Sequence, residues 1–178
     1  FSFAALLPWG LFSTALNTAS RSLTTSQNMI TKIYFPRLVL PMASVLAGLV
    51  DFAIAFVILM AMMVYYNVVP TSAIWTLPLF LLLAIITALG VALWLSAINV
   101  KYRDVNHALP FLTQFWLFLT PVAYSSAIIG DQWQLVYSLN PMAGVVNGFR
   151  WALLGTDTGP DLSLFISVGI SLVILISG

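Results

Sequence analysis

The sequence predicts an all-α fold, a polytopic transmembrane helix bundle of five spans. Of the 178 residues, 61% are hydrophobic and only 6% are charged, whereas about a quarter of the residues in an ordinary soluble domain are charged. The apolar residues are grouped in five runs, each close to the roughly 20 residues that a helix needs to cross a bilayer. This composition excludes a soluble enzyme or a nucleic-acid binder, and the absence of cysteine excludes disulfides and thiolate chemistry.

Polar connections separate the apolar runs, and the connection before the last run is the longest. The runs cover residues 1–19, 38–66, 74–100, 108–124 and 162–178. We find no internal repeat, low-complexity tract or soluble domain, so residues 1–178 form a single membrane domain. The chain begins and ends inside apolar sequence, and we therefore expect a fragment that lacks a first span and the end of its last one.

The first run is apolar up to Phe12 and then becomes polar. Ser13, Asn17 and Ser20 share one face of a helix, and an adjoining face carries Thr14, Thr18 and Arg21. Polar residues at this depth are expected to face protein or water. Ser13 and Asn17 are therefore candidates either for lining a translocation path or for hydrogen bonding between helices.

The second run contains an acidic residue, Asp51, near its centre. Its helical neighbours are small residues: Ser44, Ala47, Gly48 and Ala55. A small-residue face allows another helix to approach closely, so we expect Asp51 to point into the bundle. This intramembrane charge is either part of a proton or ion relay or a structural carboxylate paired with a donor such as Arg150 or Asn147. Because no other run contains an acidic residue, the structural interpretation is favoured.

The basic residues set the orientation of the bundle, because five of the six lie in two of the polar connections. One connection contains Arg21, Lys32 and Arg37, and the other contains Lys101 and Arg103. Two spans lie between these connections, so both face the same side, and the positive-inside rule makes that side cytoplasmic. Only Arg150 falls on the outer side, which is also the side of Phe1.

The fourth run has two distinct faces when it is wound as a helix. One is purely apolar and carries Phe111, Phe115, Phe118 and Val122; the other carries Thr113, Trp116, Thr120 and Tyr124. Hydroxyls mixed with amphipathic rings suit a path for a glycan, because sugar rings present both C–H faces and hydroxyls. The alternative is packing between helices, with Tyr124 in the aromatic belt at the membrane interface.

The long connection 125–161 contains an apolar stretch, 133–154, that is interrupted by polar residues and glycines. A spanning helix here would place Arg150 in lipid, at a cost of roughly 3 kcal/mol or more. We therefore expect two short re-entrant helices that enter from the outer face, sheltered by protein or a water-filled cavity. The alternative is an interfacial loop.

The sequence contains no signature of catalysis or of cofactor binding. It has no P-loop, so it cannot bind ATP through such a loop. His107 is the single histidine and no carboxylate cluster accompanies it, which argues against a metal site or a histidine-based triad.

Four motifs, in this order, resemble one family: NMITKIYFPRLVLP (28–41), LSAINVKYRDV (95–105), TPVAYS (120–125) and SLNPMAGVVNGFRWALLG (138–155). Together they resemble the membrane subunit of type-2 ABC transporters, specifically the polysaccharide and polyol-phosphate export permeases for O-antigen, capsule or teichoic acid. The resemblance covers essentially the whole chain.

The resemblance implies a homodimeric, multi-pass permease of the bacterial inner membrane that exports a lipid-linked polysaccharide. The family has six spans, of which this chain would hold the second to the sixth, and a separate ATP-binding cassette ATPase subunit drives transport. The cytoplasmic coupling helix that docks on this ATPase would comprise Asn28, Lys32, Tyr34, Phe35, Pro36 and Arg37. Further family features would be the second cytoplasmic loop, with Lys101, Arg103 and Asp104, and an outer gate formed by re-entrant helices, with Asn140, Pro141 and Arg150.

Two other functions remain open on the sequence alone. A type-2 ABC exporter of drugs or small lipids would share the fold but not the cargo. An ion-coupled secondary transporter would need ion ligands inside the membrane, for which Asp51 is the single acidic candidate.

Overall fold

The computed structural model describes residues 1–25, 39–102, 104–122, 137–155 and 162–178. In this part of the chain the regular secondary structure is entirely helical, which confirms the all-α prediction. The α-helices and one short 3₁₀ helix are α1 (Ser2–Thr25), α3 (Val39–Tyr65), η1 (Ser72–Thr76), α4 (Leu77–Lys101), α5 (Val105–Leu119), α7 (Pro141–Leu154) and α8 (Leu162–Ser177).

Each of the five predicted apolar runs contains a helix. Among the described residues, two stretches are long and apolar enough to cross a membrane, Val39–Tyr65 and Ser72–Lys101. Leu162–Ser177 is a shorter apolar helix. The helices of the predicted bundle are therefore present, while the number of five membrane crossings stays a prediction.

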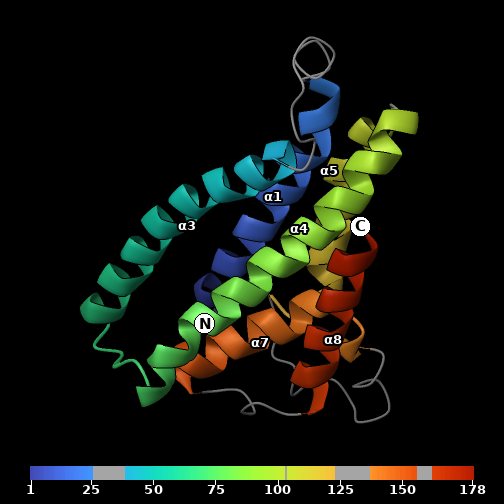
Figure 1. The fold of residues 1–178 in the computed structure, drawn as a ribbon. Helices are drawn as coiled ribbons and strands as arrows, with labels where there is room; N and C mark the ends of the chain where they lie inside the picture. Colours follow the sequence, from blue (N-terminus) through green and yellow to red (C-terminus); the bar gives the residue numbers. More distant parts are fainter. Residues whose placement is uncertain (26–38, 103, 123–136, 156–161) are drawn as a thin grey trace.

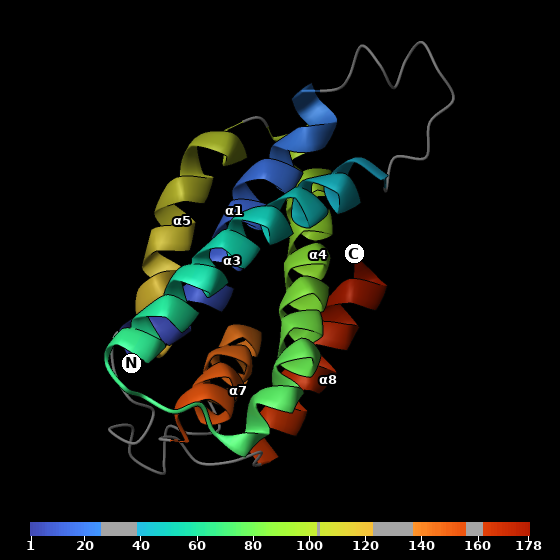
Figure 2. The same ribbon diagram turned by 90° about the vertical axis from the view of Figure 1, so that its left-hand side faces the viewer.

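Helix α1 lies at the centre of the bundle and packs against α3, α4, α5 and α7. Figures 1 and 2 show α1 between α3 and α4, with α5 beside it and α8 against α4. Small buried residues on α1 allow this crowding, namely Ala4, Ala5, Ala15 and Ala19. Small side chains let helix backbones approach closely, which is the main source of packing between helices surrounded by lipid.

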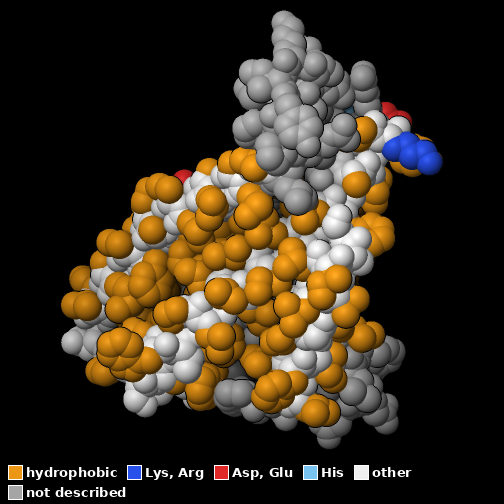
Figure 3. Space-filling view, viewed as in Figure 1, with side chains coloured by type: hydrophobic (Ala, Val, Ile, Leu, Met, Phe, Trp, Pro, Cys, Tyr) orange, Lys and Arg blue, Asp and Glu red, His pale blue; other side chains and the backbone are white. Residues whose placement is uncertain are grey.

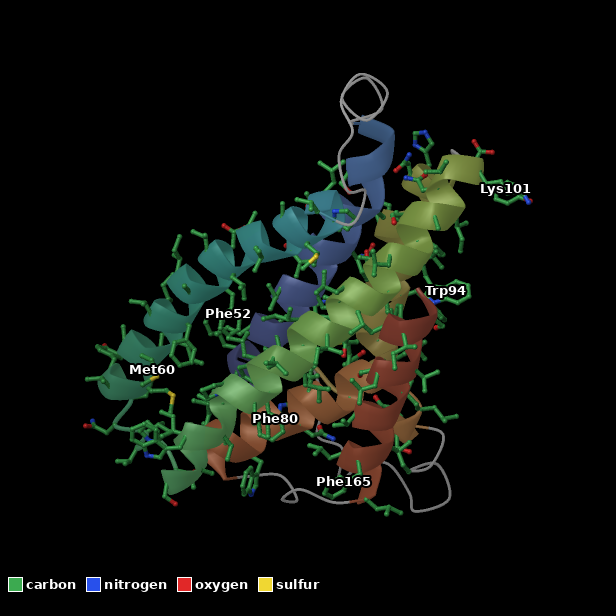
Figure 4. The ribbon with its side chains drawn as sticks, in the orientation of Figure 1. Phe52, Met60, Phe80, Trp94, Lys101 and Phe165 are labelled. Atoms are coloured by element: carbon green, nitrogen blue, oxygen red, sulfur yellow. The ribbon has the colours of Figure 1, made fainter. Side chains whose placement is uncertain are left out.

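The two ends of the bundle differ in charge. Lys101, labelled in Figure 4, lies at the end where α4 finishes, and Arg21 is bonded to Asn106 at the same end. Helix α7 lies across the opposite end (Figures 1 and 2). Between the ends, the described surface in Figure 3 is mostly hydrophobic. The prediction that both basic connections lie on one side is thus confirmed for Arg21 and Lys101.

Helix α7 packs against its neighbours through two glycines. A Cβ atom added at Gly148 would lie 2.2 Å from the Phe80 ring on α4, and one added at Gly144 would lie 2.7 Å from Ser167 Cβ on α8. Phe80 is labelled in Figure 4, where it lies close to α7. A buried hydrogen bond of 2.8 Å between the hydroxyls of Thr87 and Ser171 joins α4 to α8 beside this contact.

We expect Gly148→Ala to lower the stability of the protein by about 1–3 kcal/mol, because the new methyl group overpacks the contact with Phe80. The measurement is the midpoint of thermal unfolding in detergent. Gly169→Ala on α8 is the matched control, since nothing lies within 4 Å of the Cβ that it would add. Equal midpoints for the two variants would contradict the close approach of α7 and α4.

Candidate functional site

The candidate site is the end of the bundle opposite Lys101, where α7 begins and ends at residues suited to these positions. Asn140 is the N-cap, and its side-chain oxygen accepts a hydrogen bond from the Met142 backbone N–H. Pro141 follows at the first helical position, where a missing N–H costs nothing. Gly155 ends the helix with a φ of 62°, a left-handed conformation that glycine adopts without strain. Asparagine, proline and glycine in this motif therefore set the length of α7.

The Asn140 side chain also joins α7 to the end of α5. Its amide nitrogen donates to the Leu119 carbonyl at 3.2 Å and to the Thr120 hydroxyl at 3.0 Å. Its amide oxygen accepts from the indole N–H of Trp116 at 3.2 Å, in addition to the Met142 N–H at 3.1 Å. One amide group thus makes four hydrogen bonds to two segments of the chain.

Arg150 makes the second connection between α7 and the chain that follows α5. Its side chain is fully buried and donates to the Val122 carbonyl at 2.6 Å. Its guanidinium lies 3.9 Å from the centroid of the Phe1 ring, a cation–π contact. A buried charge is tolerated only where such partners replace water.

Helix α7 is shorter than the hydrocarbon core of a bilayer, as α5 and α8 also are, and its buried arginine distinguishes it from those two helices. Its 14 residues extend about 21 Å, against roughly 30 Å for the hydrocarbon core of a bilayer. Arg150 is enclosed by protein, as expected for a sheltered re-entrant segment. One described helix, α7, occupies the predicted stretch 133–154, and residues 133–136 lie outside the described part.

The residues predicted to line a path on α5 face its neighbours within this chain. Thr113 is buried and bonded to carbonyls of its own helix. Trp116 bonds Asn140 and packs edge-on against Phe12 of α1, with ring centroids 5.3 Å apart. Thr120 is buried as well. These contacts support the interpretation that this face of α5 packs against other helices. A role in lining a translocation path stays a prediction.

The apolar face of α5 is exposed over most of its length. Phe111 is 71% exposed, Phe115 57% and Phe118 68%, whereas Val122, just beyond the helix, is buried. On α1, Ser13 and Asn17 are half-buried, and the Asn17 amide donates to the Ser13 carbonyl. Their contacts therefore do not distinguish a path from a packing surface.

The expectation that Asp51 points into the bundle is wrong for this chain. Asp51 is exposed and lines the edge of a hollow of about 190 Å³ between α1 and α3. Among the described residues it forms neither an ion pair nor a hydrogen bond, and Arg150 bonds Val122 instead. The inward stripe of α3 runs through Val45, Gly48, Leu59 and Met63, and Asp51 is rotated away from it. The close approach at Gly48 does occur, against Leu11 of α1.

Several predicted site residues lie outside the described part of the chain. These are the predicted coupling residues Asn28, Lys32, Tyr34, Phe35, Pro36 and Arg37, together with Arg103 and Tyr124. Of the second cytoplasmic loop, Lys101 and Asp104 are exposed, and the Lys101 ammonium lies 5.4 Å from the centroid of the Tyr102 ring.

Two asparagines at the charged end, Asn99 and Asn106, were not predicted as site residues. Both are engaged in hydrogen bonds that join helices. The signal in the sequence was an asparagine inside the apolar third run, seven residues before a second one. A polar residue so close to a basic connection is typical of the end of a membrane span and does not by itself predict a functional site.

The apolar, membrane-length helices and the buried polar contacts at the bundle ends define a helical membrane protein. The chain belongs to the ABC-2 type transporter family, whose family model matches residues 1–154. The "O-antigen export system permease protein RfbA" of Myxococcus xanthus is 29% identical over 178 residues, which are 99% of this chain and 68% of that protein. A protein of the same name from Klebsiella pneumoniae is 24% identical over 177 residues, with 98% and 68% covered. These matches confirm the resemblance to this family that the four sequence motifs indicate.

We expect substitutions of Asn140 to separate its capping role from its role between helices. Asn140→Ser keeps a capping oxygen but loses the bonds to α5, and should lower stability by about 1–2 kcal/mol. Asn140→Ala should cost about 1 kcal/mol more, because the cap is lost as well.

Thermal unfolding in detergent measures both Asn140 variants. The control is Asn17→Ala, which removes an amide bonded within its own helix. Wild-type stability of Asn140→Ser would show that the bonds to Trp116 and Thr120 contribute nothing.

Proposed function

We propose that this chain is the membrane subunit of an ABC transporter that exports a lipid-linked polysaccharide across the bacterial inner membrane. The observation that carries the proposal is the match of nearly the whole chain to proteins named O-antigen export system permeases. Membership of the ABC-2 family supports a separate ATP-binding subunit as the source of energy. The protein itself acts as a transport subunit and not as an enzyme.

In this proposal the five apolar helices span the membrane and two copies of the chain enclose the path. The end that bears Arg21 and Lys101 faces the cytoplasm, and α7 covers the outer end. ATP binding to the partner subunits displaces the coupling segment around 28–37, and the bundle then changes between closed and open states.

The bonds at Asn140 and Arg150 suit α7 to the role of an outer gate. They attach the helix at two points to residues 116–122 at the end of α5. A movement of α5 would therefore carry α7 with it. The low charge of the helices favours sliding of a polymer through many weak contacts over tight electrostatic binding.

The function is tested by export in cells. The permease gene and the gene of its ATPase subunit are placed in a bacterium that makes a lipid-linked polysaccharide but lacks its own exporter. Polysaccharide on the cell surface, lost when the ATPase cannot hydrolyse ATP, supports the proposal. Export of a drug or small lipid instead, or transport that persists after ATP depletion, would contradict it.

We expect the double variant Lys32→Ala and Arg37→Ala to reduce export by about tenfold while the complex with the ATPase still assembles. Both charges lie in the segment proposed to dock on the ATPase, so their loss should uncouple hydrolysis from export. Surface polysaccharide and ATP hydrolysis are measured together. Thr31→Ala, a neutral change in the same segment, serves as the control, and unchanged export in the double variant would refute the coupling role.

A further inference from the structure

The ends of three helices meet at one buried side chain, Asn99 near the end of α4. Its amide nitrogen donates to the Ser20 carbonyl of α1 at 2.9 Å and to the Asn106 side-chain oxygen of α5 at 2.8 Å. Asn99 has no exposed surface. A single amide group thus contacts α1 and α5 in addition to its own helix.

Asn106 also accepts a hydrogen bond from α1, in addition to the one from Asn99 on α4. The Arg21 guanidinium donates to the Asn106 backbone carbonyl at 2.9 Å. The start of α5 is therefore bonded through its side chain to α4 and through its backbone to α1. We call these four residues, Ser20, Arg21, Asn99 and Asn106, the asparagine junction.

The asparagine junction differs from ordinary polar groups in these helices. Ser96, one turn before Asn99, is also buried, but its hydroxyl donates to the Leu93 carbonyl of its own helix. Such a bond stabilises a side chain without joining helices. The oxygen of the Asn99 amide, in contrast, is buried and has no partner among the described residues. An asparagine with an unmet acceptor is costly in apolar surroundings, and the two bonds that its amide nitrogen donates to other helices offset part of that cost.

The position of α5 depends strongly on its two ends. Along the helix only Leu109 and Thr113 are buried, and the phenylalanine face is exposed. Asn106 holds the beginning of α5, and Trp116 and Thr120 hold its end through Asn140. Because so little of α5 is buried between its ends, we expect a displacement of these polar contacts to displace α5 as well.

We propose that Asn99 and Asn106 are positioning residues that hold the cytoplasmic ends of α1, α4 and α5 together as one unit. The junction lies between the two connections that carry the basic residues. A displacement of either connection is thereby transmitted to α5 and through Asn140 to α7. The proposal rests on the proposed function in one respect, namely that the ATPase is the source of that displacement.

The first test measures distances directly. The chain contains no cysteine, so Thr18→Cys on α1 and Ala108→Cys on α5 introduce a pair for spin labels at two exposed positions. In the assembled transporter with both labels on one protomer and none on its partner, we expect one narrow distance distribution that is the same without nucleotide and with ATP trapped. Asn99→Ala should broaden it, whereas Ser96→Ala should leave it unchanged. A narrow, unchanged distribution in Asn99→Ala, or a shift between the two states in the wild type, would overturn the proposal.

The second test measures export per ATP hydrolysed. We expect Asn106→Ala to lower this ratio by about fivefold or more, with the rate of ATP hydrolysis retained. Asn106→Asp keeps an acceptor for the Asn99 amide and should restore the ratio, which a merely destabilising change would not predict. An unchanged ratio in Asn106→Ala overturns the proposal. Failure of the wild type to export polysaccharide would refute the proposed function instead, and the distance measurement would still decide on the junction.

Discussion

The hydrogen bonds of the Asn140 amide group are the interactions on which the α7 end of the molecule depends. The amide group starts α7 by capping its first turn, and it bonds the last turn of α5 through Trp116 and Thr120. Once α7 begins at this point, Gly144 and Gly148 lie against α8 and α4. In an apolar environment no water replaces a lost bond, so the cap, the contact with α5 and the glycine packing depend on one another.

The polar contacts that position α5 lie at the two ends of the bundle, whereas the buried Thr87–Ser171 bond joins α4 to α8 between them. The asparagine junction joins α1, α4 and α5 at the charged end, and Asn140 with Arg150 joins α5 and α7 at the other. Between them, the alanines of α1 are buried against the neighbouring helices.

The two charges within apolar surroundings are accommodated in different ways. Arg150 is enclosed and has a carbonyl and an aromatic ring as partners. Asp51 lies at the edge of the hollow between α1 and α3, where it is exposed on this chain. A fully enclosed ion needs compensating bonds, and a carboxylate exposed in the middle of a membrane-length helix needs water or a polar partner in place of lipid.

Much of the fold follows from the sequence, because apolar runs of this length in a membrane must satisfy their backbone bonds internally and therefore form helices. The sequence alone determined the helices and the common side of Arg21 and Lys101. Only the tertiary structure decided which faces meet. Helical periodicity specifies the neighbours of Asp51 on its own helix but not the helix that packs beside it, and so its predicted burial was wrong. Asn140 bonds residues of the α5 end that lie 20 to 24 positions away, and Asn99 bonds Ser20, 79 positions away. Over such separations periodicity carries no information, and only packing brings the partners together.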